Sequence, residues 1–373
     1  MIILHKGISK NKTSFRNGII SVLYLFWRFK MQFSLFDYSA RMKKIDSTKD
    51  TLSFLNEIID WELFRPTLTD IRNKDRKNKS GRKPFDVVFM FKILVIKSLY
   101  NLSDDEIEFQ ILDRLSFMRF LNVGTNDKVP DSKTIWLFQD QLTELKLIKP
   151  LFRKFDKYLR DSGFTARSGQ MIDASFVNVP IQRNSRDENG LIKSGETPPE
   201  WKEDDEPHKH KLAQKDVDAR WSVKNGKRYF GYKNHIEVDV ANKFIRDYTT
   251  TDASVHDCNI FEEIFDNENE SPLVYADSAY SSEEKRNMMK EKGFVDKVIR
   301  KAYRNKKLSD EDAKWNKKVS KVRGRVEHIF GVQFQMAHGS RILRTIGKAN
   351  AHTQIGLRNL VYNIMRLKYL KTI

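Results

Sequence analysis

The spacing of apolar residues changes twice along this 373-residue chain, and that change limits the folds it can adopt. Up to about residue 168, apolar residues recur at helical spacing, and from Asp310 onward they do so again. Between these parts lie short apolar runs and alternating stretches that are typical of strands. We therefore expect a helical first part, a mixed α/β sheet with its own helices, and a helical end.

The first helical part covers residues 51–150, and its helix starts can be read from capping residues. Ser103 followed by Glu106 forms a capping box, in which each residue satisfies a free backbone N–H of the other. A further helix begins at Asp131 or Ser132, because both residue types favour the N-cap position. The sequence thus predicts a compact helical domain, to which we assign residues 31–149.

A basic arm precedes most of these helices. Seven of the twelve residues from Arg72 to Lys83 are Lys or Arg. A helical unit behind such an arm suits DNA binding, in which basic side chains contact phosphates. A plain helical bundle used for dimerisation fits the pattern equally well, so both interpretations stay open.

The second domain, residues 165–370, is expected to hold the sheet. Period-two alternation from Lys227 to Asp239, a turn at Asn242 and a second run predict a hairpin. Because a hairpin follows the first strand, the sheet is mixed and not a doubly wound parallel repeat. Residues 180–226 are interpreted as a loop insertion. The other elements expected here are strands at 169–177, 272–277 and 295–299, a helix at 257–265, and a helix capped by Ser281 with Glu284.

The composition points to a polyanionic partner and a reducing compartment. The formal net charge is +18, which favours nucleic acid first and an anionic membrane second, although a merely basic surface is an alternative. The single cysteine, Cys258, excludes a disulfide framework and a zinc site built from several thiolates. A reducing, cytoplasmic-type compartment is expected.

The start of the chain has the outline of an extension. The apolar stretch from Ile19 to Trp27 is nine residues long, too short to span a bilayer as a helix. We therefore expect no membrane partner. Residues 1–30 are interpreted as a non-functional extension with Met31 as the true start, and an N-terminal amphipathic helix is the alternative.

Three carboxylates stand at structurally meaningful points of the second domain. Asp173 and Asp277 end short apolar runs, and Glu327 lies beside the apolar stripe of a basic helix. Each aspartate alone is explained at least as well by a structural role, such as pairing with a buried arginine. Three such acids in a basic chain, however, suggest a hard-cation site that acts on phosphate.

Six motifs in a fixed order carry a family resemblance. The chain contains, in sequence, MIDASFV, DVDARW, FGYKNH, TDASVHD, YADSAYSS and RGRVEHIFG. This set resembles the bacterial insertion-sequence transposases of the insertion-sequence-5 group, within the DDE transposases. The resemblance implies an RNase H-like catalytic domain in which Asp173, Asp277 and Glu327 bind two Mg²⁺ ions, with Mn²⁺ as a substitute.

The resemblance also implies the reaction and the partners. Water would cut double-stranded DNA at the terminal inverted repeats, and the freed 3′-hydroxyl would attack target DNA. Such enzymes act as homodimers on paired ends. A metal-dependent nuclease without strand transfer, or a sequence-specific DNA-binding repressor, is the alternative.

Basic residues near the third acid are the expected DNA contacts, because backbone phosphates attract Lys and Arg. One departure from the family pattern is visible. Where the family has a lysine seven residues past the glutamate, this chain has Phe334, and where it has a tyrosine before the arginine, this chain has Ser320. The residues expected to contact DNA are Arg323, Arg325, Lys317, Lys321 and, on the hairpin, Lys233. The residues that could replace the missing lysine are Lys348, Arg341 and Arg344.

Overall fold

The computed structural model divides the chain into two compact units, residues 1–54 and 55–373. In the first unit, helix α2 spans Leu35–Asp46 and helix α3 (Thr51–Ile58) begins. The expected extension at 1–30 and most of the basic arm lie outside the described part of the chain. The described residues are 35–48, 50–73, 83–202, 210–280, 282–302, 307–339 and 342–372.

The second unit opens with helices, as the sequence predicts. The capping box at the start of α6 is confirmed, since Ser103 accepts a bond from the backbone N of Glu106 at 3.2 Å and donates its own N–H to that side chain at 2.7 Å. Asp131 caps α8 by accepting from the N of Thr134 at 2.8 Å. The helices are η1 (Trp61–Phe64), α4 (Arg65–Leu68), η2 (Thr69–Arg72), α5 (Val87–Leu99), α6 (Asp104–Asp113), α7 (Leu115–Leu121), α8 (Ser132–Glu144) and α9 (Ile148–Asp161).

The sheet is mixed, which confirms the α/β expectation. Strand β1 is antiparallel to β3 on one side and parallel to β5 on the other, and β6 is parallel to β5. The long strand β3 pairs with β4 through its residues 232–238 and with β2 through residues 227–231. The strands are β1 (Gln170–Asn178), β2 (Arg220–Lys224), β3 (Lys227–Asp239), β4 (Ile245–Asp252), β5 (Leu273–Ala276) and β6 (Val295–Val298).

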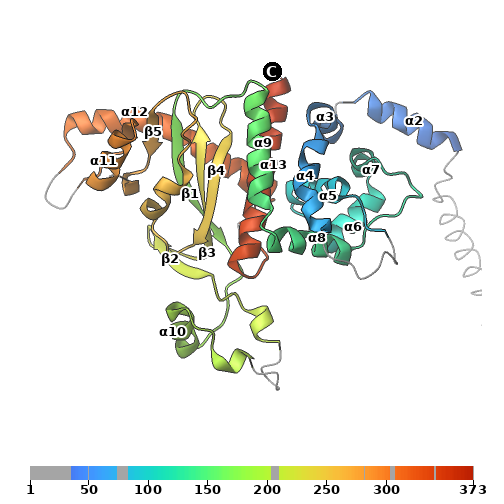
Figure 1. The fold of residues 1–373 in the computed structure, drawn as a ribbon, viewed down its shortest axis with the longest axis horizontal. Helices are drawn as coiled ribbons and strands as arrows, with labels where there is room; N and C mark the ends of the chain where they lie inside the picture. The colour runs from blue at the N-terminus through green and yellow to red at the C-terminus, as the bar shows by residue number, and fades with distance from the viewer. Residues whose placement is uncertain are drawn as a thin grey trace, which may run out of the picture. The chain divides into compact units, whose positions relative to one another are not determined.

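Helices cover both faces of the sheet (Figure 1). On one face, Ile172 of β1 packs with Phe261, Tyr280 and Met289 in an apolar cluster. The other face carries α12 and α13, and Val326 and Ile329 of α12 are buried there. The covering elements are η5 (Asp257–Ile264), η6 (Ser278–Tyr280), α11 (Glu283–Glu291), α12 (Asp310–Met336) and α13 (Lys348–Thr372).

Buried amides fix α13 against the sheet. Asn359 exchanges two hydrogen bonds with Asn234 of β3, at 2.9 and 3.0 Å, and accepts a third from Gln333 of α12. Asn363 bonds to both the N–H and the carbonyl of Ile245. The helical end that the sequence predicts is thus confirmed, and its polar residues Asn359 and Asn363 can be buried because β3, β4 and α12 supply their partners. Among the described helices, none is both long and apolar enough to cross a bilayer.

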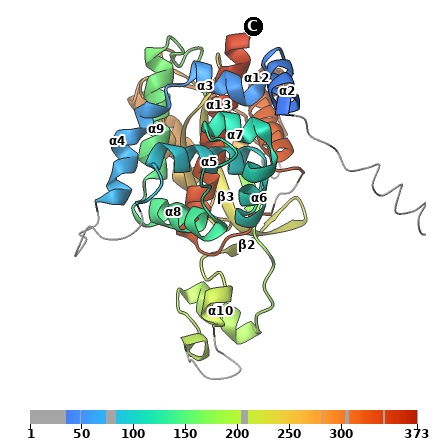
Figure 2. The same cartoon turned by 90° about the vertical axis from the view of Figure 1, so that its right-hand side faces the viewer.

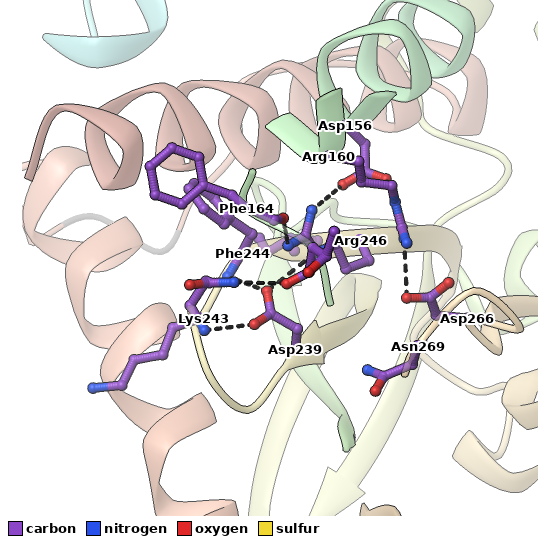
Figure 3. A network of polar contacts seen from close by, with 12 residues as sticks. Asp156, Arg160, Phe164, Asp239, Lys243, Phe244, Arg246, Asp266 and Asn269 are labelled. Carbon is purple, nitrogen blue, oxygen red and sulfur yellow. Dashed lines mark hydrogen bonds and ion pairs between the residues drawn. The ribbon is translucent and has the colours of Figure 1, made fainter. Parts of the chain in front are cut away.

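An ionic network joins α9 to the hairpin formed by β3 and β4 (Figure 3). The buried guanidinium of Arg246 donates to Asp156 of α9 at 2.8 Å and to Asp239 of β3 at 3.1 Å. Arg160 of α9 pairs with Asp156 at 2.7 Å and with Asp266 at 3.0 Å. A buried charge is tolerated when it is paired in this way, so the network sets the position of α9 on the sheet.

The insertion at 180–226 contains regular structure, so its interpretation as a loop is wrong. It holds α10 (Arg186–Ser194), η3 (Pro199–Lys202), η4 (Leu212–Gln214) and strand β2. Both views place α10 beyond the end of the sheet that β2 borders (Figures 1 and 2). A capping box of Ser185 with Glu188 begins α10. Two further corrections are that Ser282, not Ser281, caps α11, and that residues 257–264 form a 3₁₀ helix.

Candidate active site

Strands β1 and β5 bring Asp173 and Asp277 side by side. The strands are parallel neighbours in which Ile172 pairs with Ala276. Asp173 and Asp277 are the next residues along the chain after this pair. Because neighbouring strands lie about 4.8 Å apart, the two carboxylates, far apart in sequence, meet at one point of the sheet.

Asp173 faces the helices α12 and α13. Successive residues of a strand point to opposite faces, and its neighbour Ile172 belongs to the cluster on the other face. The Asp173 carboxylate is largely buried and accepts a bond from the guanidinium of Arg323 at 2.7 Å, while Ala174 N donates to its other oxygen at 2.8 Å. Arg323 of α12 is thus a direct partner of the first acid.

The electrostatics of Asp173 reflect this position. Burial raises the pKa of its carboxyl group, and the Arg323 guanidinium and the Ala174 N–H oppose that rise. The nearby Asp277 carboxylate raises the pKa further, and the ammonium of Lys224 lowers it. The net result is a raised pKa, so a cation placed between the two aspartates would favour the charged form of Asp173.

Glu327 stands one helical turn from Arg323 on α12. The two side chains approach to 3.6 Å, and the Glu327 side chain remains 70% exposed. Arg323 therefore lies between the buried first acid and the exposed third acid. The structure places all three acids in one region, with Glu327 at its solvent side.

The donor set can be tested against a metal. The three acids offer only oxygen ligands, which Mg²⁺ prefers. Asp173 and Asp277 fit, because a divalent cation would offset the repulsion between two adjacent carboxylates. Within the described ranges, however, no three His, Cys, Asp or Glu side chains are close enough to hold one ion. A shared site would require Arg323 to release Asp173 and Glu327 to turn inward.

Three of the expected DNA contacts form a stripe on α12. Lys317, Lys321 and Arg325 follow one another at intervals of four residues, which places them on one side of the helix. All three are exposed. The stripe is therefore accessible to a large polyanion.

Comparison with known proteins identifies the family. Residues 39–141 match the family described as "Transposase domain (DUF772)", and residues 165–364 match the family described as "Transposase DDE domain". The second match covers more than half of the chain. The chain belongs to the DDE transposase family. This transposase therefore has its candidate site inside the part that matches the DDE domain.

Two individual proteins can be set beside this transposase. It is 29% identical over 262 residues to the transposase for insertion sequence element IS1106 of Neisseria meningitidis serogroup B, covering 68% of this chain and 79% of that protein. A cryo-EM structure of a piggyBac transposase synaptic complex with hairpin DNA is also similar. The alignment covers 84% of this chain and 75% of the piggyBac chain. Its TM-score of 0.39 and 10% identity do not establish a shared fold.

Lys233 of this transposase does not suit the role expected of it. Its ammonium is 2.8 Å from Asp257 and 2.6 Å from the carbonyl of Val255, and it lies over the ring of Phe176. The residue is buried. An ammonium held by these partners is not available to a phosphate, so we leave Lys233 out of the proposed DNA surface.

Tyr280 lies close to the acids and was not singled out by the sequence. Its hydroxyl is buried and has no hydrogen-bond partner among the described residues. Burial raises the pKa of Tyr280, and the carboxylates of Asp257, Asp173 and Asp277 raise it further. The phenol therefore stays protonated and can only donate or accept a hydrogen bond there.

Strand β2 is the second feature that the sequence interpretation missed. An available signal was Asn225-Gly226 between alternating residues, the strongest short-range sign of a two-residue hairpin turn. The structure confirms that sign, with φ angles of 51° at Asn225 and 73° at Gly226. This hairpin brings Lys224 close enough to influence Asp173.

The replacement for the family lysine stays unassigned. Arg341 lies outside the described residues. Arg344 is near Glu106 of α6, where hydrogen bonds from Ser103 chiefly lower the pKa of the glutamate and Arg344 contributes. Lys348 begins α13. The positions of Arg344 and Lys348 do not favour either residue as the contact to a DNA end.

Proposed function

We propose that this transposase cuts double-stranded DNA at the ends of an insertion sequence and joins the freed 3′-hydroxyl to target DNA. The observation that carries the proposal is the adjacency of Asp173 and Asp277 on paired strands, facing Arg323 and Glu327 of α12. Membership of the DDE family supports it. The closer assignment to the insertion-sequence-5 group is part of the same proposal.

The strand order supports an RNase H-like catalytic domain. Strands β4, β3 and β1 are antiparallel neighbours, and β5 and β6 continue the sheet parallel to β1. The first acid lies on the central strand of this order and the second just past the end of the adjacent parallel strand. Rigid strands of this kind hold ligands more precisely than loops do.

Asp173, Asp277 and Glu327 are the residues that would hold two Mg²⁺ ions, with Mn²⁺ as a substitute. When bound, the ions would supply activation of the attacking oxygen and stabilisation of the leaving oxygen. Arg323 pairs with Asp173 at 2.7 Å and, once released, would be free to contact a phosphate. Glu327 can turn inward because its side chain is exposed and its only ion pair with a described residue is the one to Arg323.

The DNA would contact α12 along the exposed stripe of Lys317, Lys321 and Arg325. The terminal inverted repeats and the target are the proposed partners, and a homodimer holding two ends is the proposed assembly. The cytoplasm, at the bacterial nucleoid, is the proposed place of action. Binding through phosphates should weaken steeply with added salt.

The direct test replaces one acid. We expect Asp277→Asn to reduce cleavage and joining of a labelled inverted-repeat end by at least about 1,000-fold, because the amide cannot neutralise a metal ion as a carboxylate does. Binding to the same DNA should persist. The measurement is product formation on a gel with a plasmid target and Mg²⁺, with and without EDTA.

A matched control is Asp113→Asn, at an exposed acid in the last turn of α6, which should retain wild-type activity. Full cleavage by Asp277→Asn would refute the site assignment. Cleavage without a joined product in the wild-type protein would favour a nuclease, and binding without cleavage would favour a repressor.

A further inference from the structure

The hairpin of β2 and the facing end of β3, residues 220–231, carries an unusual concentration of positive charge. Lys224, Lys227 and Arg228 are exposed at its tip. The hairpin contains no Asp or Glu, and none of the three cations pairs with an acid in the part of the chain that the structure describes. Their charge is therefore available to an external partner.

The hairpin is held in a fixed position. Tyr229 stacks on Phe176 of β1, with ring centroids 4.1 Å apart and an interplanar angle of 9°. Phe230 is buried in the cluster that also contains Tyr232 and Leu343. The tight turn at its tip and this packing at its base restrict the conformations of the tip. A rigid element loses little conformational entropy on binding.

Gly231 lets the hairpin approach β1 closely. Its φ is 141°, which a side chain rarely allows, and a Cβ there would overlap the carbonyl oxygen of Val177 and lie 2.9 Å from Val179 N. At this residue β3 changes partners from β4 to β2. The position of the hairpin is thus set by backbone packing against the strand that carries the first acid.

Exposed apolar side chains accompany the cations. Trp221 is 47% exposed and Val223 is 65% exposed, on the same side of β2. The Trp221 ring packs against the buried ring of Phe230, at a centroid distance of 5.0 Å. The register pairs Val223 with Arg228, so Arg228 shares the face of Trp221, whereas Lys224 and Lys227 lie at the tip on the other face. An aromatic ring with cations on the same hairpin suits a nucleic-acid strand, because bases stack on the ring and phosphates pair with the charges.

The hairpin also lies near the candidate active site. From Asp173, strand β1 continues to its last residue, Asn178, which pairs with Gly231 at the base of the hairpin. Figure 1 shows β2 at the end of the sheet where β1 finishes. DNA held by the hairpin would continue along β1 toward the first acid.

We propose that the β2–β3 hairpin is a second DNA-binding element, separate from α12, that holds the strand entering the active site. The inference rests on the proposed function, because it assigns part of the same substrate. DNA fits better than a protein partner, since lysine is depleted at protein interfaces and two of the three cations are lysines. Lysine on an edge strand also discourages pairing with a second sheet.

The test measures binding without chemistry. A triple variant, Lys224→Gln with Lys227→Gln and Arg228→Gln, is compared with the wild type by fluorescence anisotropy on a labelled random-sequence duplex and on the same sequence as a single strand. We expect at least about ten-fold weaker binding. The plot of log affinity against log salt should become shallower by roughly two to three units, since each lost phosphate contact removes about 0.9.

A matched control removes the same charge elsewhere. Arg153→Gln with Lys154→Gln and Lys157→Gln lowers the net charge equally on α9, away from the hairpin. We expect this variant to keep most of the binding and of the salt slope. Equal losses in both triple variants would overturn the proposal, because binding would then follow total charge alone.

Trp221 provides a second, independent variant. Trp221→Ala should weaken single-strand binding by about ten-fold, as the loss of one stacked base does, and Trp221→Phe should restore most of it. Unchanged binding together with a changed oligomeric state in light scattering would instead mark a protein contact and refute the inference. Because Asp277→Asn is expected to bind DNA normally, failure of catalysis and failure of hairpin binding are measured separately.

Discussion

Glu237 of β3 is the most unusual single residue of the interior. Its side chain is fully buried, and neither carboxylate oxygen has a hydrogen-bond partner among the described residues. Burial raises its pKa well above the ordinary value, the charges of Asp266 and Asp239 add to the rise, and Arg246 opposes it. Glu237 is therefore protonated in the folded protein over a wider pH range than in the unfolded chain.

This raised pKa makes stability depend on pH. The unfolded chain releases the Glu237 proton above about pH 4.5, whereas the folded protein retains it, so the contribution of Glu237 to stability falls as pH rises toward its folded pKa. We expect Glu237→Gln to match the wild type near pH 4 and to be the more stable protein at pH 8, by urea unfolding.

Glu237→Met serves as the matched apolar replacement. It removes the unpaired polar group at every pH and should stabilise the fold by about 1–3 kcal/mol. If Glu237→Gln were no more stable than the wild type at pH 8, Glu237 would have to be charged and paired in the folded state.

Single residues also differ in how well their positions and roles could be predicted from the sequence. The positions of Asp173 in a strand and of Asp277 just after one could be predicted, because each follows a short apolar run. Their role as metal ligands was implied by the family resemblance and stays a prediction. The role of Lys233 could not, because alternation along β3 does not reveal that Asp257 and Val255 cover that face. The ion pair of Arg323 with Asp173 joins residues 150 positions apart. Such pairing depends on how α12 crosses the sheet and leaves no local pattern.

At the scale of elements, α13 approaches the sheet closely at Gly356. A Cβ at this position would overlap the hydroxyl of Tyr248 of β4 and would lie 2.8 Å from Cγ1 of Ile148. The Tyr248 ring also packs against Phe152 of α9, at a centroid distance of 4.9 Å. Glycine is therefore required by packing here, although its backbone angles are helical.

We expect Gly356→Ala to destabilise the protein by about 1–3 kcal/mol, the usual cost of overpacking. Part of that loss should disappear in a Tyr248→Phe background, since the phenol oxygen is the atom nearest the added methyl group. Tyr248→Phe alone should cost little, because this buried hydroxyl has no described partner. The measurement is a double-mutant cycle of unfolding free energies, and additive effects would contradict the assigned contact.

The helices and strands were predictable to different degrees. The apolar face of α12 and the hairpin of β3 with β4 could be predicted from the spacing of apolar residues alone. The insertion did not, because its short elements carry too few apolar residues to set a period, even though the capping box of Ser185 with Glu188 was visible. Adjacent serines likewise left the start of α11 ambiguous, and the backbone selected Ser282.

At the scale of the whole second unit, α13 connects the helical part to the sheet. Thr143 of α8 donates a hydrogen bond to Thr353 of α13 at 3.0 Å, and six residues further along α13, Asn359 bonds to Asn234 of β3. Family models divide the chain into residues 39–141 and 165–364. The helix that ends the second segment packs against both, which sequence segments alone do not reveal.

Because α13 packs against both the helical part and the sheet, we expect residues 55–373 to unfold in one cooperative transition. Leu360 of α13 is fully buried, and Leu360→Ala should cost about 2–5 kcal/mol. Because α13 packs against both parts, hydrogen exchange should accelerate in α5 and in β3 to the same extent. Leu112→Ala, at a residue 62% exposed on α6, is the matched control and should change neither. Faster exchange confined to the sheet would mean that the helical part folds independently of α13.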